Sequence, residues 1–299
     1  PTSPFPGSYS VKKGLKIFGT CPGKWANKMK SRTIVAALSA LLMSGVLAEA
    51  GAQNAITYTG SVGIEAHRQM YREPSIDVTE NGWFGGITLD GQAEYQRWQL
   101  RADALFVYGR MNYSGSGTVD GIDDVELEGR IAIGRALPVG AEGRNRITPY
   151  FGYGYRRLLD YLGGKVSSTG AHGYDRLSQY HYVPIGIEGQ FRLGDAWSIK
   201  PTIEYDHLIR GTQDSYLSQA VAGLGDVHNT QHSGYGVRGS LMAGTTAWSW
   251  PIEFGPVVRY WNIKQSDTRP VTFRGVTVIG GFEPANHSIE VGLALKVRF

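Results

Sequence analysis

The last fourteen residues of the chain alternate between apolar and polar side chains. The even positions carry Ser288, Glu290, Gly292, Ala294, Lys296 and Arg298. The odd positions carry the apolar row Ile289, Val291, Leu293, Leu295, Val297 and Phe299. Because successive side chains of a strand point to opposite faces, this pattern predicts a strand with one apolar face and one polar face. The apolar row closes on an aromatic residue at the end of the chain.

The same alternation recurs along the chain between clusters of turn residues. Glycine accounts for 41 of the 299 residues, about twice its usual share of ~7%, and aromatic and β-branched residues fill the stretches between turns. The pattern predicts ten strands over residues 56–69, 83–95, 98–108, 124–134, 147–157, 180–193, 197–209, 235–243, 250–262 and 287–299. The chain is therefore expected to be all-β, with its strands antiparallel and joined in sequence order.

The links between these strands alternate in length. Short links cover 96–97, 194–196 and 244–249, with an intermediate one over 135–146, and long links cover 70–82, 109–123, 158–179, 210–234 and 263–286. Within the last long link, residues 271–279 alternate well enough to predict an additional hairpin. Short turns at one rim and long loops at the other are typical of an up-and-down transmembrane β-barrel. An even number of strands places both ends of the barrel at the short-turn rim.

The two faces of the expected strands differ in chemistry. Apolar residues such as Ile64, Phe106 and Ile203 fall on one face, and charged residues such as Glu65 and Arg101 fall on the other. Aromatic residues are expected to form two girdles, one at the short-turn end (Tyr95, Trp98, Trp197, Trp248, Trp250 and Phe299) and one at the loop end (Trp83, Tyr108, Tyr155, Tyr260 and Trp261). A soluble β-sandwich or lipocalin-like barrel would show the same alternation, but it would explain neither the girdles nor the terminal Phe299.

The first part of the chain has the pattern of a secretory signal peptide. A basic patch, Met29-Lys30-Ser31-Arg32, precedes an apolar run over 34–47 and the small-residue sites Ala48-Glu49-Ala50 and Ala50-Gly51-Ala52. We expect residues 29–52 to be the signal peptide and 53–299 to be the mature barrel. We expect residues 1–28 to be an upstream extension that is foreign to the native protein. An uncleaved signal anchor is the alternative.

Removing this leader changes the charge balance of the chain. Seven of its 30 Lys and Arg residues and one of its 26 Asp and Glu residues precede Gln53, so 23 basic and 25 acidic residues remain. The basic pI belongs to the leader, and the mature chain offers no argument for nucleic-acid binding. The one cysteine, Cys21, is also in the leader. We therefore expect neither disulfides nor thiolate chemistry in the mature protein.

The leader, the ten alternating strands, the loop pattern and the terminal Phe299 together resemble the outer-membrane β-barrel superfamily of Gram-negative bacteria, although no particular subfamily is matched. The resemblance covers residues 53–299. It implies a location in the bacterial outer membrane and contact with outer-membrane lipid and lipopolysaccharide. It also implies insertion by the barrel-assembly machinery, with the apolar row from Ile289 to Phe299 as the assembly signal. Known ten-stranded members include the omptin proteases and the Opc-type adhesins.

A rim hydrolase of the omptin or lipid A deacylase kind is a further alternative. Omptins use a His and an Asp two residues apart, which share one face of a strand. In this chain the nearest approach is Asp206 next to His207, and adjacent strand residues face opposite sides. The pairs His232-Ser233 and His287-Ser288 meet the same objection. We therefore predict no enzyme activity, no catalytic residues, no metal site and no cofactor.

Charged residues of both signs are expected to line the barrel interior. This lumen charge network comprises Arg101, Asp103, Glu126, Glu128, Arg130, Glu188, Arg192, Lys200, Glu204, Arg238, Arg259, Glu290 and Lys296. Interleaved charges favour pairing across the lumen, whereas a selective pore usually carries rings of one sign. Ten strands also enclose a lumen close to the size that side chains fill. We therefore predict a closed or narrow barrel that acts through its extracellular loops, in surface binding, adhesion or an envelope-structural role. A narrow, weakly selective porin is the alternative.

Overall fold

The computed structural model describes residues 55–140 and 143–299. The predicted signal peptide over 29–52 and the extension before it lie outside the described residues. Residues 56–299 form one compact unit. In the described part of the chain, no helix is long and apolar enough to cross a membrane.

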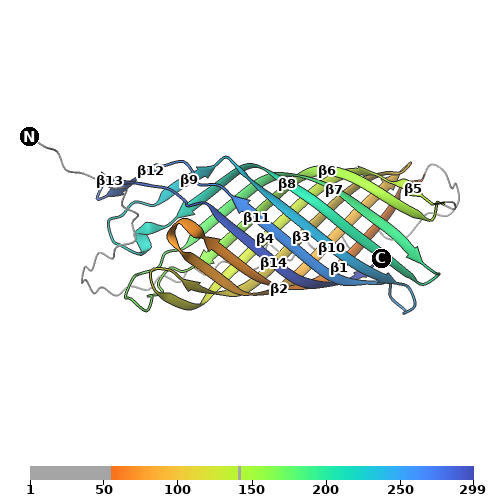
Figure 1. The fold of residues 1–299 in the computed structure, drawn as a ribbon, viewed down its shortest axis with the longest axis horizontal. Helices are drawn as coiled ribbons and strands as arrows, with labels where there is room; N and C mark the ends of the chain where they lie inside the picture. The colour runs from red at the N-terminus through yellow and green to blue at the C-terminus, as the bar shows by residue number, and fades with distance from the viewer. Residues whose placement is uncertain (1–54, 141–142) are drawn as a thin grey trace, which may run out of the picture. The chain divides into compact units, whose positions relative to one another are not determined.

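Ten long antiparallel strands build the wall of a closed barrel (Figure 1). In chain order they are β1 (Thr57–Glu73), β2 (Val78–Tyr95), β3 (Trp98–Ser114), β4 (Thr118–Arg135), β6 (Asn145–Tyr161), β7 (Arg176–Leu193), β8 (Trp197–Ser215), β10 (Gly234–Thr245), β11 (Ile252–Ile263) and β14 (Asn286–Arg298). Each pairs with its sequence neighbour, and β14 pairs with β1 to close the barrel. The predicted up-and-down barrel is confirmed, as is each of the ten strands.

Four shorter strands and two single-turn 3-10 helices complete the described secondary structure. β5 (Leu137–Val139) pairs with β6, and β9 (Val227–Gln231) pairs antiparallel with residues 211–215 at the end of β8. β12 (Arg269–Phe273) and β13 (Val276–Gly281) form the hairpin that the sequence predicted within the last loop. The 3-10 turns are η1 (Pro74–Ile76) and η2 (Leu217–Gln219).

The barrel closes where β1 pairs with β14, and we call this pairing the seam. Val62 faces Val297 and Ile64 faces Leu295, so the apolar rows of the two strands lie side by side on the outer surface. At the end of the seam, Gly60 and Phe299 exchange two backbone hydrogen bonds of 2.8 and 2.9 Å. Phe299 thus completes the ladder of the first strand as well as the apolar row of the last.

The links differ in length between the two ends, but less than the sequence predicted. At the end that carries Phe299, which we call the short-turn end, β2 and β3 are joined by Gln96 and Arg97, both with positive φ. At the opposite end, the loop end, the predicted long links over 70–82 and 109–123 are wrong. The strands continue there, and only residues 74–77 and 115–117 remain as turns.

The outer surface of the wall carries a wide apolar belt. Large apolar side chains point outward and are exposed from every side of the wall, including Tyr58, Ile64, Phe151, Ile203 and Leu293. Charged outward residues such as Arg68 and Arg110 follow toward the loop end. Buried Glu, Arg, Gln and His side chains point inward from the same strands. A barrel that is apolar outside and polar inside has the solvent preference of a transmembrane β-barrel.

The orientation of the barrel can be tested with epitope tags. Gly170 and Gly223 lie in loops at the loop end, and Gly194 lies in the turn between β7 and β8 at the short-turn end. We expect antibodies to label tags at Gly170 and Gly223 on intact cells, and to reach a tag at Gly194 only after permeabilisation. The reverse labelling pattern would contradict this orientation.

Candidate functional site

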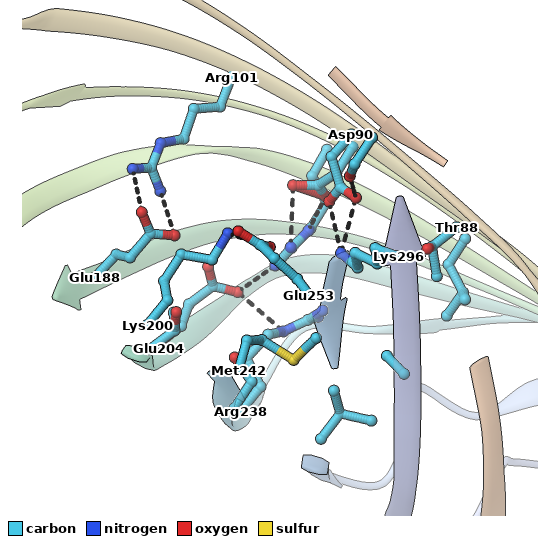
Figure 2. Close-up of a pocket in the computed structure, with 18 of the residues that line it drawn as sticks. Thr88, Asp90, Arg101, Glu188, Lys200, Glu204, Arg238, Met242, Glu253 and Lys296 are labelled. Carbon is cyan, nitrogen blue, oxygen red and sulfur yellow. Dashed lines mark hydrogen bonds and ion pairs between the residues drawn. The ribbon is translucent and has the colours of Figure 1, made fainter. Parts of the chain in front are cut away.

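The lumen contains layers of ion pairs, beginning near the short-turn end. Arg101 binds Glu188 with two hydrogen bonds of 2.9 and 3.2 Å, which span the lumen from β3 to β7. Lys296 lies 2.8 Å from Asp90. Lys200 lies 2.8 Å from Glu253, which also pairs with Arg298. Figure 2 shows how these groups converge from different strands.

The next layer is centred on Arg238 of β10. Its guanidinium lies 2.8 Å from Glu128 and 2.9 Å from both Glu204 and Asp206. Glu128 belongs to β4, so this contact joins opposite walls of the barrel. Arg130 binds Glu204 at 2.6 Å, and it also binds Asp103. All four carboxylates of this layer therefore contact an arginine, as buried charges require.

Two tyrosines also contribute to this layer. Tyr182 donates a hydrogen bond to Glu128, and its ring lies under the Arg238 guanidinium. Tyr150 donates to Glu204 at 2.7 Å. Neither tyrosine was predicted from the sequence, because a tyrosine on a strand can belong either to the aromatic girdle or to the lumen. Tyr182 lies six residues from Glu188, and Tyr150 lies six residues from Arg156. Strand alternation therefore places each tyrosine on the inward face and could have identified it.

The third layer lies beneath the loop end of the apolar belt. Arg259 binds Glu65 at 2.6 and 2.7 Å and also contacts Glu290. Arg156 bridges Glu290 to Glu126 and is 2% exposed. This layer joins β1, β4, β6, β11 and β14, and together with the Arg238 layer we call it the central ion network.

Apolar side chains fill the space above the network. One cluster contains Phe84, Leu105, Val107, Met111 and Ile122. The other contains Tyr180, Tyr182, Leu208, Trp261 and Ile263. The assignment of Trp261 to the outer girdle was wrong: it is 3% exposed and packs inside against Tyr180 and Tyr182. Trp261 lies two residues from the inward-facing Arg259, so strand periodicity places it inside as well.

A cavity of about 230 Å³ lies on the short-turn side of the network. Its walls carry the paired charges of the first two layers (Figure 2). Side-chain exposure is 37% for Asp90 and 20% for Lys296 there, against 2% or less for Arg156 and Glu290. The lumen is therefore accessible from the short-turn end and filled toward the loop end.

Of the thirteen residues predicted for the lumen charge network, the structure brings twelve into ion pairs. Arg192 differs. It is exposed at the short-turn end, where its backbone N–H donates to Asn145, and its guanidinium has no ion pair with any described residue. The wall ends at this level, so Arg192 reaches water rather than the packed lumen.

The adjacent acid and histidine that were considered for a hydrolase lie on opposite sides of the wall. Asp206 is buried in the lumen and His207 is exposed outside, as the strand alternation predicts. A couple that the sequence did not suggest forms between His228 and Asp214, whose side chains meet at 2.5 Å on the outer surface of the β8 and β9 pair. This couple could act as a base, but it supplies no nucleophile.

At the loop end a second group of charges is unbalanced. We call Glu73, Glu80, Asp124, Asp160 and Glu283 the loop-end acidic cluster; Arg176 binds Glu73 at 3.2 Å and also binds Glu283. Asp124 and Asp160 lie directly opposite each other on β4 and β6. Like charges at such positions repel each other, and the oxygens of Asp160 have no hydrogen-bond partner among the described residues.

Comparisons with known proteins give only distant similarities. The sequence matches no known family model. It also has no detectable similarity to a curated protein. Among solved structures, Neisserial surface protein A is 9% identical, with 82% of this chain and 99% of that chain covered and a TM-score of 0.29. The translocator domain of the autotransporter NalP from Neisseria meningitidis is 11% identical, with 87% and 92% covered and a TM-score of 0.35.

An outer membrane channel from Pseudomonas putida F1 is 12% identical, with 85% of this chain and 100% of that chain covered and a TM-score of 0.34. With such low identities and TM-scores, the strand pairing and surface of the chain itself decide its class. Ten antiparallel strands close into one wall that is apolar outside and charged inside. The protein is a ten-stranded, up-and-down transmembrane β-barrel.

The loop-end acidic cluster predicts a pH dependence of stability. Burial and the neighbouring Asp160 raise the pKa of Glu80 to about 8. Burial also raises the pKa of Asp160 to about 6 and that of Glu283 to about 7, although Arg176 acts in the opposite direction. The unfolded chain releases these protons near pH 4. The folded barrel therefore binds more protons between about pH 4 and pH 8, and its stability falls as the pH rises through that range.

We expect the urea midpoint of the barrel in detergent to be lower at pH 9 than at pH 5. Glu80→Gln should flatten this dependence, because it removes a carboxyl that must ionise in a buried site. Asp77→Asn is the matched control, since Asp77 is exposed in a left-handed conformation that Asn tolerates. Equal midpoints at both pH values would show that the cluster does not affect stability.

Proposed function

We propose that the protein is a closed barrel of the bacterial outer membrane that acts through its extracellular end. The observation that carries this proposal is the central ion network. Arg156, Glu126 and Glu290 are at most 2% exposed, and they join β6, β4 and β14 across the lumen. A solute would have to break these contacts and also displace the aromatic cluster around Trp261. Both requirements favour a barrel without a continuous pore.

The loops support an action at the outer surface because they are tied to one another. Asp175 accepts the backbone N–H of Gly163 and a side-chain hydrogen bond from Gln219, which joins the loop before β7 to the loop after β8. The backbone N–H of Arg274 donates to Gly223 at 2.7 Å, which fixes the β12 and β13 hairpin to the same loop. The loop end is thus a prearranged surface, which lowers the entropy cost of binding.

The hairpin offers a contact site on this surface. Val276 and Val278 of β13 are 67% and 57% exposed, and Phe282 just beyond β13 is also exposed. Within the described residues, β13 pairs only with β12, so no strand occupies its other edge. Exposed apolar side chains on a free edge suit a protein partner that adds a strand. We therefore assign surface binding or adhesion to this hairpin.

Lipid and the assembly machinery remain expected partners. Outward-facing cations lie just beyond the apolar belt toward the loop end, among them Arg68, Arg72 and Arg210. Their position suits the phosphates of lipopolysaccharide in an outer leaflet. The exposed apolar row that ends at Phe299 is the surface we expect the barrel-assembly machinery to bind.

A narrow pore is the second candidate. The cavity of about 230 Å³ with its paired Lys, Arg, Asp and Glu side chains favours it, since such walls accommodate water and small ions. Conduction would require the central ion network to rearrange. The two candidates therefore differ in one measurable property, the conductance of the unmodified barrel.

We expect the purified barrel in a planar bilayer to stay closed or to show only small, poorly selective openings. Arg238→Gln should increase the openings, because Glu128, Glu204 and Asp206 then lose their common counter-ion. Removing one partner of a buried ion pair commonly destabilises by about 3–5 kcal/mol. Arg274→Gln, on the exposed hairpin, is the control. A large, steady, ion-selective conductance of the unmodified barrel would make transport the leading function.

Binding through the hairpin can be tested on whole cells. Cells that display the barrel should adhere to immobilised matrix proteins more than cells without it, and Val276→Ser with Val278→Ser should abolish the difference. Val166→Ser is the matched control, because Val166 is an exposed valine on a different loop. Surface labelling of a loop tag would confirm equal display. No gain in adhesion from the unmodified barrel, or an equal loss in the control, would contradict the assignment.

A further inference from the structure

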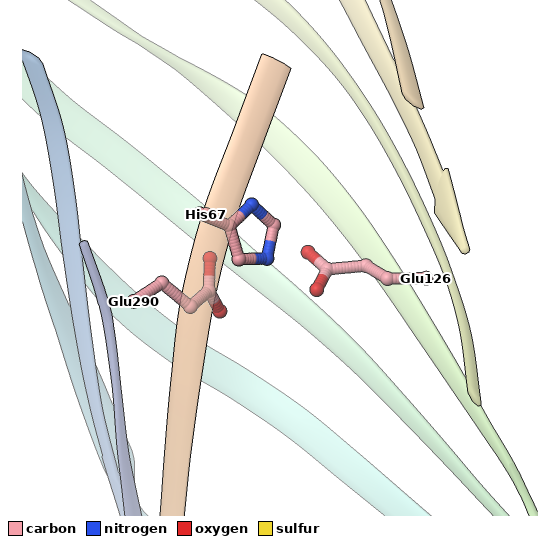
Figure 3. Close-up of side chains that lie close together, drawn as sticks. All are labelled: His67, Glu126 and Glu290. Atoms are coloured by element: carbon pink, nitrogen blue, oxygen red, sulfur yellow. The ribbon is translucent and has the colours of Figure 1, made fainter. Parts of the chain in front are cut away.

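We propose that His67, Glu126 and Glu290 form a binding site for a divalent transition-metal ion, with Zn²⁺ as the best fit. Figure 3 shows the imidazole ring of His67 between the two carboxylates. One ligand atom from each residue lies within 4.8 Å of the other two, and all three side chains are buried. They come from β1, β4 and β14, so the ion would join the two seam strands to the opposite wall.

His67 is held in the form that binds a metal. Its Nδ1 atom lies 3.0 Å from Glu65, so with the proton on Nδ1 it donates to that carboxylate and leaves the lone pair on Nε2. The ring stacks on Phe84, which fixes its orientation. A carboxylate on the far nitrogen of a histidine is the usual outer partner in metal sites.

The Nε2 atom of His67 supplies an independent indication of a ligand. The side chain is 0% exposed, and Nε2 has no hydrogen-bond partner among the described residues. Glu126 Oε1 is also without a hydrogen bond there. Buried polar atoms without partners are rare in native structures and commonly mark a bound water or ion. Nε2 of His67 is such an atom, whereas Glu126 Oε1 keeps an ion-pair contact of 3.0 Å with Arg156.

The distances are compatible with one ion. Zn²⁺ binds imidazole nitrogen and carboxylate oxygen at about 2.0–2.2 Å, so two ligands of one tetrahedral ion lie about 3.3–3.6 Å apart. The three atoms of the site lie within 4.8 Å of one another, so side-chain movements of about an ångström would bring them to that spacing. The imidazole ligand favours Zn²⁺ and related metals over Mg²⁺ and Ca²⁺, which prefer oxygen ligands alone.

The charge of the central ion network also favours a cation. Its carboxyl groups outnumber its guanidiniums by seven to four, a formal excess of three negative charges. The acids are Glu65, Asp103, Glu126, Glu128, Glu204, Asp206 and Glu290, and the bases are Arg130, Arg156, Arg238 and Arg259. A divalent ion would reduce this excess to one.

Arg156 would share the two carboxylates with the ion. Its Nη2 atom donates to Glu126 Oε2 at 3.0 Å and to Glu290 Oε1. Its Nε atom lies 3.0 Å from Glu126 Oε1 without donating to it. Glu126 Oε1 is therefore the oxygen that the ion would take. The guanidinium would remain as an outer partner that orients both acids.

The ion could enter from the short-turn side. Glu65 and Arg259 belong to the wall of the large cavity, whereas Arg156 borders a smaller cavity of about 40 Å³ on the other side. The proposed site lies between the two cavities. Glu65 thus connects the large cavity to His67, which it contacts directly.

The test uses the purified full-length barrel, stripped of metal and then exposed to ZnCl₂ in detergent. We expect one Zn²⁺ per folded barrel after dialysis, and a higher urea midpoint when Zn²⁺ is present. Co²⁺ should give the visible absorption bands of a site with nitrogen and oxygen ligands. His67→Phe, which keeps the stacking on Phe84, and Glu126→Gln should each reduce the bound metal from one ion to none.

The controls separate this site from adventitious binding and from misfolding. His228→Phe removes an exposed histidine beside Asp214 and should leave the single Zn²⁺ in place. Metal content is compared only in barrels that keep the heat-resistant mobility of the folded form. If neither His67→Phe nor Glu126→Gln folds, the test relies on the unmodified barrel. Its Zn²⁺ content after dialysis and the change of its urea midpoint with Zn²⁺ are then the two measurements. The proposal is wrong if the unmodified barrel retains no Zn²⁺, or if His228→Phe removes it. A His67 that stays doubly protonated in NMR spectra after Zn²⁺ is added would overturn it as well.

Discussion

The structure depends on pairing charges inside a lumen from which side chains exclude most of the water. A strand that faces lipid on one side must place its polar residues on the other, and in a barrel of ten strands that other side is narrow. An unpaired charge there would be costly, so each inward guanidinium has to meet carboxylates from other strands. Arg238 meets this condition through Glu128 on the opposite wall. The wall and the network therefore support each other: the wall excludes water, and the network holds the wall closed.

The network also divides the barrel into two unlike halves. Toward the short-turn end the charges are partly exposed around a cavity, and Lys296 and Asp90 can exchange contacts with water. Toward the loop end the aromatic cluster around Trp261 fills most of the lumen and leaves a smaller cavity of about 40 Å³. Beyond that cluster acidic residues outnumber basic ones, and several acids surround Arg176. Stability and any binding of cations are thus expected to vary with depth along the barrel, with the loop end the more sensitive to pH.

Most of the fold could be predicted from the sequence, because lipid on one side and packed charges on the other force a strict alternation. The ten strands and the hairpin near Val276 follow from it. The strand ends near Glu73 and Ser114 do not, since above the apolar belt the outer face meets water instead of lipid. Polar residues then occur on both faces, and the alternation no longer marks a strand. Trp261 was misplaced because an aromatic residue near a strand end fits either a girdle or the lumen, and only its register beside Arg259 distinguishes them.

The site was harder to predict than the wall. The alternation identifies Glu65 and His67 as inward, yet Glu126 and Glu290 reach His67 only through the curvature and stagger of the closed barrel. Sequence separation gives no guide to such contacts, because β1 and β14 are the two ends of the wall. The residues that pair with Arg238 could not be predicted from the sequence for the same reason.

If the lumen is closed between its two ends, a thiol near one end cannot be reached from the other, and cysteine labelling measures this accessibility. In a Cys21→Ser background, Thr59→Cys places a single thiol on the wall of the large cavity. A small charged thiol reagent should modify it rapidly from the short-turn side and leave it unmodified when added only to the loop side. Rapid modification from the loop side would mean that a continuous path crosses the barrel, and would contradict the closed lumen.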